Sequence, residues 1–459
     1  MQDTSGGDGA MAMKAKADST NVDADRHFAA ARKVLVAGIS GAARENTALG
    51  RPMLAARGDG AWTVAPDGTR YIDLHGGYGA TILGHNHPRV RAAIERALDM
   101  GIVLGPETLY QERLAARLVE VIPIAELVRY ASSGTEATMS AIRLARAHTG
   151  RDKILKFEGH FHGLHELVVF STHPPARPPA PGELLAPIVD SGGVPAAFAG
   201  AVVVAPWNDI AAAERAFREH GNDLAAVIME PVHYNAGCIL PDPEYLRVVR
   251  DLATRAGTVL IYDEILSGFR TGIGGAQGHF EVFPDVTLLG KAVANGVPIA
   301  VIVGKREVME SFSPLGTAAH SGTFSGHLFG VLASLATLEE LSAPGFYDGP
   351  AGILAMAERL YSGLREVFAR AGLNCSVNGF GTRFALYFGQ EPDFMPRAYQ
   401  DITGCDTDLL RRFARACFEK EVVFHTYDVV IGHHGFGQAH DAAVIDEALN
   451  RIESACATL

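Results

Sequence analysis

The stretch from Val259 to Gly304 constrains the fold of this chain more than any other. It holds three short apolar runs, and the first two end in polar residues, Asp263 and Glu264 after V-L-I-Y, and Lys291 after T-L-L-G. Continuous apolar runs of this length are typical of strands that are buried on both faces of a mostly parallel sheet. Open α/β sheets bind ligands at the carboxyl ends of such strands. We therefore predict an α/β fold that brings Asp263 and Lys291 into one site.

A lysine and a neighbouring carboxylate suit the chemistry of pyridoxal 5'-phosphate (PLP). The amine of Lys291 can form a Schiff base with the aldehyde of PLP. The carboxylate of Asp263 can hold the pyridine nitrogen protonated, so that the ring acts as an electron sink. The alternative for the acidic pair alone is an ordinary strand end, accompanied by a solvated lysine.

A second motif, S-S-G-T-E-A, opens a predicted helix that continues to His148. Backbone N–H groups at a helix N-terminus, together with Ser and Thr hydroxyls, form a phosphate site. The alternative is a plain Ser/Thr cap with Glu136 in the first turn.

These motifs, in this order, resemble the cofactor signature of class III PLP-dependent aminotransferases, especially the glutamate-1-semialdehyde aminomutase-like branch. The resemblance extends over roughly residues 27–455. It implies PLP fold type I, in which a large domain with a mostly parallel central sheet is joined to a smaller α+β domain. It also implies that PLP is the cofactor, that Lys291 holds it as a Schiff base and later acts as the base, and that Asp263 contacts the ring nitrogen.

The resemblance also assigns the residues around the phosphate and the ring. Ser133, Gly134 and Thr135 match the family's phosphate cup. Phe161 stands in the G-H-F-H-G motif, whose aromatic residue stacks on one face of the pyridine ring. Ile265, two residues beyond Asp263, is expected to pack on the opposite face.

Two further positions follow from the same resemblance. Asn235 in E-P-V-H-Y-N-A-G matches the asparagine near the phenolic oxygen of the cofactor. Thr323 in H-S-G-T-F-S-G-H matches a threonine that reaches the cofactor phosphate of the partner subunit. The implied protein is an obligate homodimer with a shared active site.

The substrate residues are less strongly marked. Arg44 ends G-I-S-G-A-A-R, whose spacing resembles an aminomutase segment with a carboxylate-binding arginine. The alternative is a surface arginine. Tyr78 in H-G-G-Y-G and His233 are expected to line the substrate pocket, with loop packing as the alternative. The C-terminal segment F-H-T-Y-D-V-V-I-G-H-H-G-F-G contains no arginine, which argues against a two-arginine dicarboxylate site.

The predicted activity is therefore transamination from a carboxylate-bearing amino acid, such as a D-, aromatic or β-amino acid, to a keto acid. An intramolecular aminomutase of the glutamate-1-semialdehyde type is the alternative. A racemase or decarboxylase on the same fold is a further alternative, because all these reactions begin from the same bond between the substrate and PLP.

The 459 residues suffice for two domains. We expect a disordered tail over 1–25, whose composition is polar and rich in glycine. An N-terminal segment over 26–75, with a helix and a hairpin around P-D-G, is expected to pack with the small domain. The large PLP-binding domain is predicted over 76–330 and the small C-terminal domain over 331–459.

Composition excludes several classes of function. The 40 basic and 52 acidic residues give a net charge of −12, which argues against nucleic acid or an anionic membrane surface as partner. No apolar run reaches the length of a membrane span. Five cysteines without paired spacing indicate free thiols in a reducing compartment, so we expect a cytoplasmic protein.

Three histidines, at positions 160, 162 and 165, raise the question of a metal site. The sequence H-E-L-V-V does not match the H-E-x-x-H zinc pattern, and no other set of ligands has metal spacing. We therefore predict no metal.

Overall fold

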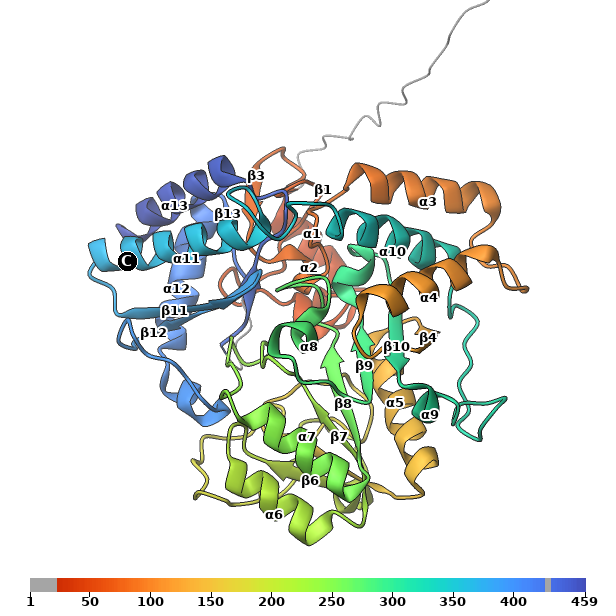
Figure 1. The fold of residues 1–459 in the computed structure, drawn as a ribbon. Helices are drawn as coiled ribbons and strands as arrows, with labels where there is room; N and C mark the ends of the chain where they lie inside the picture. The colour runs from red at the N-terminus through yellow and green to blue at the C-terminus, as the bar shows by residue number, and fades with distance from the viewer. Residues whose placement is uncertain (1–22, 426–430) are drawn as a thin grey trace, which may run out of the picture.

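A computed structural model describes residues 23–425 and 431–459 (Figure 1). Most of the predicted tail, residues 1–22, lies outside the described residues. The described chain opens with helix α1 (Ala24–Ala31), so helix begins before the predicted end of the tail at residue 25. Asp23 caps this helix, because its side chain accepts the N–H groups of Asp25 and Arg26.

The centre of the structure is a seven-stranded sheet with the order β4-β10-β9-β8-β7-β5-β6. Every neighbouring pair is parallel except those made by β10, which runs antiparallel to both β4 and β9. The predicted α/β class with a mostly parallel sheet is therefore confirmed. The strands are β4 (Leu127–Ala131), β5 (Lys153–Phe157), β6 (Val202–Ala205), β7 (Leu224–Met229), β8 (Val259–Glu264), β9 (Val286–Leu289) and β10 (Ala300–Gly304).

Helices on both faces explain why the strand sequences do not alternate between apolar and polar residues. In β8, Val259 and Ile261 join a core cluster that includes helix α5 (Gly134–Thr149). Leu260 and Tyr262 point to the other face and join the cluster that includes α6 (Ile210–His220) and α7 (Tyr245–Ala256). Figure 1 shows α5 on one side of the sheet and α6 and α7 on the other.

Two smaller sheets lie outside the central one. The order β11-β12-β14 joins Cys375–Phe380, Arg383–Phe388 and His434–Gly435. The order β1-β2-β3-β13 joins Arg57–Asp59, Trp62–Val64, Arg70–Asp73 and Val422–Val423. The antiparallel β2–β3 pair confirms the predicted hairpin, and β3 also pairs with β13 in parallel. This pairing joins the N-terminal segment to the C-terminal part of the chain. The domain division at residues 75 and 330 stays a prediction.

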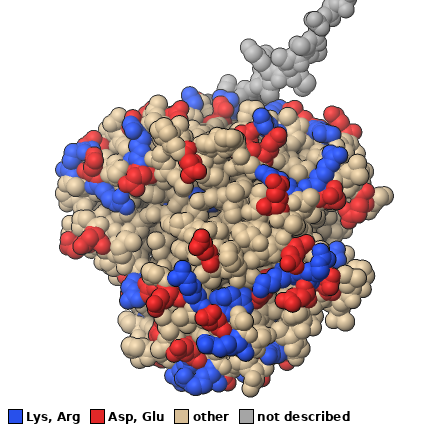
Figure 2. Space-filling model, viewed as in Figure 1, with Lys and Arg blue, Asp and Glu red and all other residues tan. Residues whose placement is uncertain are grey.

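The longer helices follow the apolar periodicity of the sequence. Helices α3 (Pro88–Met100), α4 (Leu109–Val121) and α10 (Leu328–Leu341) pack together beside the central sheet. The C-terminal sheet is accompanied by α11 (Ile353–Arg370), α12 (Thr407–Glu419) and α13 (Ala442–Cys456). Across residues 23–425 and 431–459, no helix has both the length and the apolar character needed to cross a membrane. On the face shown in Figure 2, acidic and basic side chains are interspersed.

The buried central strands set a stability prediction. Replacing Leu260, which is fully buried in β8, by alanine should lower the free energy of unfolding by about 2–5 kcal/mol, because it leaves a cavity in the sheet. Leu98 on α3 is largely exposed, so Leu98→Ala should change the free energy by less than about 0.5 kcal/mol. Urea denaturation of the cofactor-free proteins measures both, and equal losses would contradict the burial of β8.

Candidate active site

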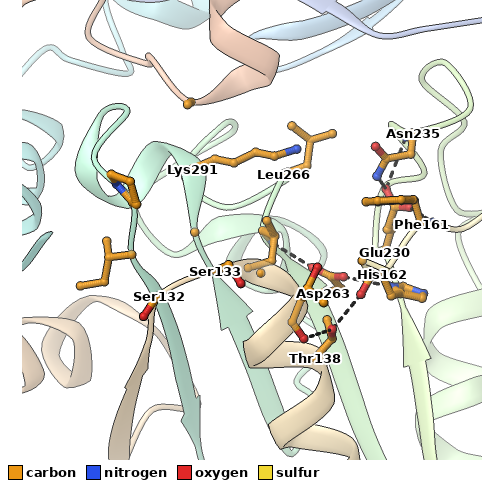
Figure 3. Close-up of a pocket in the computed structure, with 18 of the residues that line it drawn as sticks. Ser132, Ser133, Thr138, Phe161, His162, Glu230, Asn235, Asp263, Leu266 and Lys291 are labelled. Carbon is orange, nitrogen blue, oxygen red and sulfur yellow. Dashed lines mark hydrogen bonds and ion pairs between the residues drawn. The ribbon is translucent and has the colours of Figure 1, made fainter. Parts of the chain in front are cut away.

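A cavity of about 330 Å³ opens at the carboxyl ends of β8 and β9, beside the start of α5 (Figure 3). Its position follows from the topology, because the polar residues after each parallel strand meet at one edge of the sheet. The cavity is lined by Ala80, Ser132, Ser133, Gly134, Thr135, Thr138, Phe161, His162, Gly163, Glu230, Asn235, Asp263, Ile265, Leu266, Gly290, Lys291, Gly296, Val297, Pro298 and Ile299.

Lys291 stands just beyond β9, and Figure 3 shows its side chain extending into the cavity. Its backbone has φ of 43°, a left-handed conformation that a non-glycine residue seldom adopts. Such strain persists where the surrounding structure imposes it, and it is common at functional sites. Burial, together with the nearby charges of Arg383 and Arg270, lowers the pKa of the Lys291 amine to about 8. More of this amine is therefore neutral and nucleophilic near neutral pH than in an ordinary lysine.

Asp263 ends β8 and is 4% exposed. One of its oxygens lies 2.8 Å from Nδ1 of His162, and the other accepts the N–H of Ile265 at 3.1 Å. Since a carboxylate accepts hydrogen bonds, this contact places the His162 proton on Nδ1. The hydroxyl of Thr138 donates to the carbonyl of His162 at 2.7 Å, which fixes the histidine against α5.

The turn before α5 has the geometry predicted for a phosphate site. Ser133 is the N-cap of the helix, and its hydroxyl accepts the N–H of Glu136 at 3.3 Å. The cap and the phosphate cup are therefore compatible readings of the same turn. Gly163 packs against Thr135 so closely that an added Cβ would lie 2.5 Å from the threonine hydroxyl, and its φ is +97°. Glycine is required there to bring the 161–163 loop onto the helix start.

A buried carboxyl group joins two other predicted cofactor contacts. Glu230 accepts the backbone N–H of Phe161 and the side-chain amide of Asn235, both at 2.9 Å. Burial, together with the charge of Asp263, raises the pKa of Glu230 to about 8. Glu230 is therefore largely protonated at neutral pH.

The cofactor residues predicted from the sequence converge. Seven of them line this cavity together with Lys291, namely Ser133, Gly134, Thr135, Phe161, Asn235, Asp263 and Ile265. Thr323 does not, since it is exposed and lines a different surface cavity with Tyr130 and Gly326. His162 and Glu230 stand inside the quoted motifs, but the sequence alone assigned them no role, because their contacts cross between strands.

The predicted substrate residues are placed differently. Arg44 and Tyr78 line a second cavity of about 410 Å³, and the hydroxyl of Tyr78 donates to the carbonyl of Ala43 at 2.7 Å. The 76–80 loop, which contains the short helix α2 (Gly76–Gly79), lies between the two cavities. Gly77 and Tyr78 line the second cavity, whereas Ala80 lines the first.

His233 lines neither of these cavities. It is 0% exposed, and paired backbone bonds with Ile239 turn it inward, where its ring lies 4.2 Å from that of His160. In this structure it therefore holds a packing position rather than the predicted place in the substrate pocket. Within the described ranges, no group of three or more histidine, cysteine or acidic residues could hold a metal ion.

The residues of the first cavity fit the PLP that the sequence implies. Lys291 supplies an amine, Asp263 a carboxylate held in place on two sides, and the turn before α5 a set of N–H donors suited to phosphate. Phe161 and Ile265 add apolar surface between these polar groups. The cavity also lies within the range of volumes usual for small ligands.

Comparisons with known proteins agree with this site. A family model for class III aminotransferases matches residues 43–420. The fold is similar to an ω-transaminase from Sphaerobacter thermophilus, with 30% identity, a TM-score of 0.87 and coverage of 95% of this chain and 97% of that one. A β-phenylalanine aminotransferase from Variovorax paradoxus is 29% identical, with a TM-score of 0.81 and coverage of 94% and 93%.

A third structure is similar in fold alone. It is a glutamate-1-semialdehyde aminomutase from Pseudomonas aeruginosa PAO1, solved in complex with PMP, with 22% identity and a TM-score of 0.83. The two chains are covered to 95% and 94%. Transaminases and an aminomutase are therefore both among the similar structures.

The raised pKa of Glu230 predicts a pH dependence of stability. The folded protein holds this proton more tightly than the unfolded chain, whose carboxyl titrates near 4.5. The contribution of Glu230 to stability is thus complete below pH 4.5 and is lost as pH rises through about 8. Glutamine cannot titrate, so the free energy of unfolding of Glu230→Gln should gain on that of the wild type by up to about 1.4 kcal/mol per pH unit between pH 5 and 8.

Urea denaturation of the cofactor-free proteins across this pH range measures the difference between the two. Other titrating groups are common to both proteins and cancel. Parallel pH profiles would contradict a protonated Glu230 in the folded state.

Proposed function

Because the chain belongs to the class III aminotransferase family and is a PLP-dependent enzyme, we propose that it transfers an amino group from a carboxylate-bearing amino acid to a keto acid. The observation that carries this proposal is the convergence of Lys291 and Asp263 in one cavity beside the turn before α5. The 30% identity to an ω-transaminase over nearly the whole chain supports transamination.

In this proposal each residue of the first cavity has a separate task. Lys291 holds PLP covalently and, once released, moves the proton at the amine-bearing carbon of the substrate. When bound, PLP supplies an electron sink for the charge that develops at that carbon. Asp263, fixed by His162, keeps the ring nitrogen protonated, and the 133–135 turn binds the phosphate. Phe161 and Ile265 contact the ring, and Asn235 lies near its phenolic oxygen.

The substrate carboxylate is assigned to the second cavity. Arg44 lines it, and the bond from Tyr78 to the neighbouring Ala43 ties this segment to the 76–80 loop. In this proposal the amine of the donor lies near Lys291, and its carboxylate faces the side of Arg44. The donor is a carboxylate-bearing amino acid, for which a D-, aromatic or β-amino acid is proposed.

An intramolecular aminomutase of the glutamate-1-semialdehyde type is the alternative, because its fold is similar. The two reactions differ in where the nitrogen goes. A transaminase passes it to a second molecule, whereas an aminomutase returns it to the molecule that supplied the carbon skeleton.

Nitrogen labelling distinguishes these reactions. A panel of D-, L- and β-amino acids carrying ¹⁵N is incubated with the holoenzyme and unlabelled keto acids, and the products are followed by mass spectrometry. We expect label in the amino acid formed from the keto acid. Lys291→Ala should abolish the transfer, since it removes the amine that carries out the proton step. Lys153→Ala, a surface substitution at an ion pair with Asp223, should leave it unchanged.

Failure of every donor to pass label to a keto acid, with PLP bound, would contradict transamination. It would favour the aminomutase, or a racemase or decarboxylase on the same fold.

We further propose that the enzyme is a homodimer with a shared site, in which Thr323 contacts the cofactor phosphate of the partner subunit. Thr323 is exposed and lines a surface cavity with Val103, Leu104 and Gln111 rather than the PLP cavity of its own chain. The neighbouring Phe324 is 59% exposed. A second copy covering this surface would bury these apolar side chains and give Thr323 its proposed contact.

Complementation tests the shared site. Lys291→Ala and Thr323→Val should each be impaired alone, the second in PLP affinity. Mixed after dissociation and reassociation, they should form heterodimers in which one of the two sites has both native residues. About a quarter of all sites should then regain native PLP affinity and transfer activity. No gain on mixing, with dimers seen in sedimentation, would place Thr323 outside the partner's site.

The location of the enzyme stays a proposal as well. All five cysteines lie in the described residues, and all are buried free thiols. This agrees with the reducing cytoplasm that we propose for the protein.

A further inference from the structure

Two arginines are buried beside the active site, and neither has a carboxylate partner within residues 23–425 and 431–459. Arg270 follows β8 and Arg383 begins β12, and each is 1% exposed. Arg270 donates to the carbonyls of Leu266 and Gly79 and to the hydroxyl of Thr382. Among the described residues, neither guanidinium lies within 4.0 Å of an acid.

Arg383 contacts two segments that lie near the site. It donates to the carbonyl of His75 at 3.3 Å and to the carbonyl of His433 at 3.2 Å, and it also bonds the ring of His433. His433 belongs to the C-terminal segment in which the sequence offers no arginine. The guanidinium of Arg383, which belongs to β12, therefore lies beside that segment.

The two guanidinium groups lie together behind residues 76–79 of the 76–80 loop. A Cβ added to Gly79 would lie 3.3 Å from Nη2 of Arg270 and 3.6 Å from Cζ of Arg383, so both groups face this one residue. Ala80, the next residue, lines the PLP cavity, as does Leu266, whose carbonyl Arg270 holds. The arginine pair is thus separated from the cavity by a single layer of chain.

The acids that the structure describes nearby balance the charge of this pair only in part. Asp73 is the carboxylate whose charge acts on Arg383, but its oxygens are bonded to His85, Thr63 and two backbone N–H groups. Glu230 is largely protonated at neutral pH, as its raised pKa shows. The charges of both arginines also act on the amine of Lys291, and the charge of Asp263 opposes them there.

Buried charges are costly unless an opposite charge accompanies them. Arg151 shows the contrast, because it also donates to several carbonyls without an acid, but it is partly exposed and its charge stays hydrated. Arg270 and Arg383 have no such hydration. Their carbonyl partners satisfy hydrogen bonds, but among the described residues neither guanidinium has an acid paired directly with it in this medium of low dielectric constant.

We propose that Arg383, with Arg270 beside it, is a specificity-determining residue that makes the site select a donor with a carboxylate over a neutral amine. The inference rests on the proposed function and deepens it. The pair acts across the 76–79 loop as a fixed positive field, and the carboxylate of the bound donor supplies the missing counter-charge. This role is distinct from the direct contact proposed for Arg44, which lines the outer cavity.

A purely structural role would have a different signature. Arginines that only hold carbonyls fix the loop for every ligand, so their loss would weaken acids and neutral analogues alike. The electric field of the arginines, in contrast, strengthens binding of the charged acid and leaves the affinity for the neutral analogue unchanged. The ratio of the two affinities therefore separates the two roles.

The test uses the holoenzyme and a matched pair of probes, 3-phenylpropanoate and 3-phenylpropanamide. Their dissociation constants are measured by calorimetry for the wild type, Arg383→Met, Arg383→Lys and Arg365→Met. Arg365 is the control, since it also donates to a backbone carbonyl in the C-terminal domain, that of Val377, but is exposed. Binding needs no turnover, so its result is independent of the nitrogen-transfer experiment.

We expect the wild type to prefer the carboxylate, and Arg383→Met to lose about tenfold of that preference while its affinity for the amide is unchanged. Arg383→Lys keeps the charge and should keep most of the preference, while Arg365→Met should match the wild type. If Arg383→Met does not fold, Arg383→Lys distinguishes the two roles. If Arg383 only held carbonyls, the lysine variant would lose affinity for both probes, whereas a role of its charge predicts that both affinities are largely kept.

Three results would overturn the inference. They are a wild type without carboxylate preference, an unchanged preference in Arg383→Met, and an equal loss for both probes. If the enzyme transfers nitrogen but binds both probes equally well, the proposed function stands and only the role of the arginine pair is contradicted.

Discussion

The bond between Asp263 and His162 is the interaction on which the active site depends. A carboxylate that is 4% exposed needs partners, and Asp263 finds one in a histidine from the loop after β5. Thr138 fixes the histidine from α5. One buried charge thus joins a strand, a loop and a helix, and the turn that opens that helix is the one proposed to bind phosphate.

Electrostatics divides the buried groups around this bond into different protonation states. Burial raises the pKa of Glu230 and lowers that of Lys291, so one acid is held protonated and one amine is partly neutral near neutral pH. Asp263 remains as the acceptor. Burial also lowers the pKa of Arg270 to about 10 and that of Arg383 to about 9, yet both stay charged at neutral pH and bias the site toward an anionic ligand.

The sequence predicted the parts of this structure that local pattern determines. The buried strands, the hairpin around P-D-G and the helix opened by S-S-G-T-E-A follow from apolar patterning, turn residues and a cap. The predicted cofactor residues that line the first cavity followed from motifs that resemble those of class III aminotransferases. The antiparallel direction of β10 did not, because strand direction is set by connections rather than by composition.

What the sequence missed depends on contacts between distant segments. His233 stands in a motif beside the site, yet its pairing with Ile239 turns it into the core. Arg383 begins an apolar strand, R-F-A-L-Y-F. A charged residue at the start of such a run was the one sign in the sequence that this arginine has a special role. Only the fold shows that its guanidinium reaches the loop at His75 and the segment at His433.

The measurement that tests the central claim most directly is reductive trapping of the cofactor. Holoenzyme prepared with PLP is treated with borohydride, digested, and its peptides are sequenced by mass spectrometry. The account predicts that the reduced cofactor is attached to Lys291 and that no other lysine carries it in stoichiometric amount. Attachment to a different lysine, or no attachment although PLP binds, would contradict the assignment of the active site.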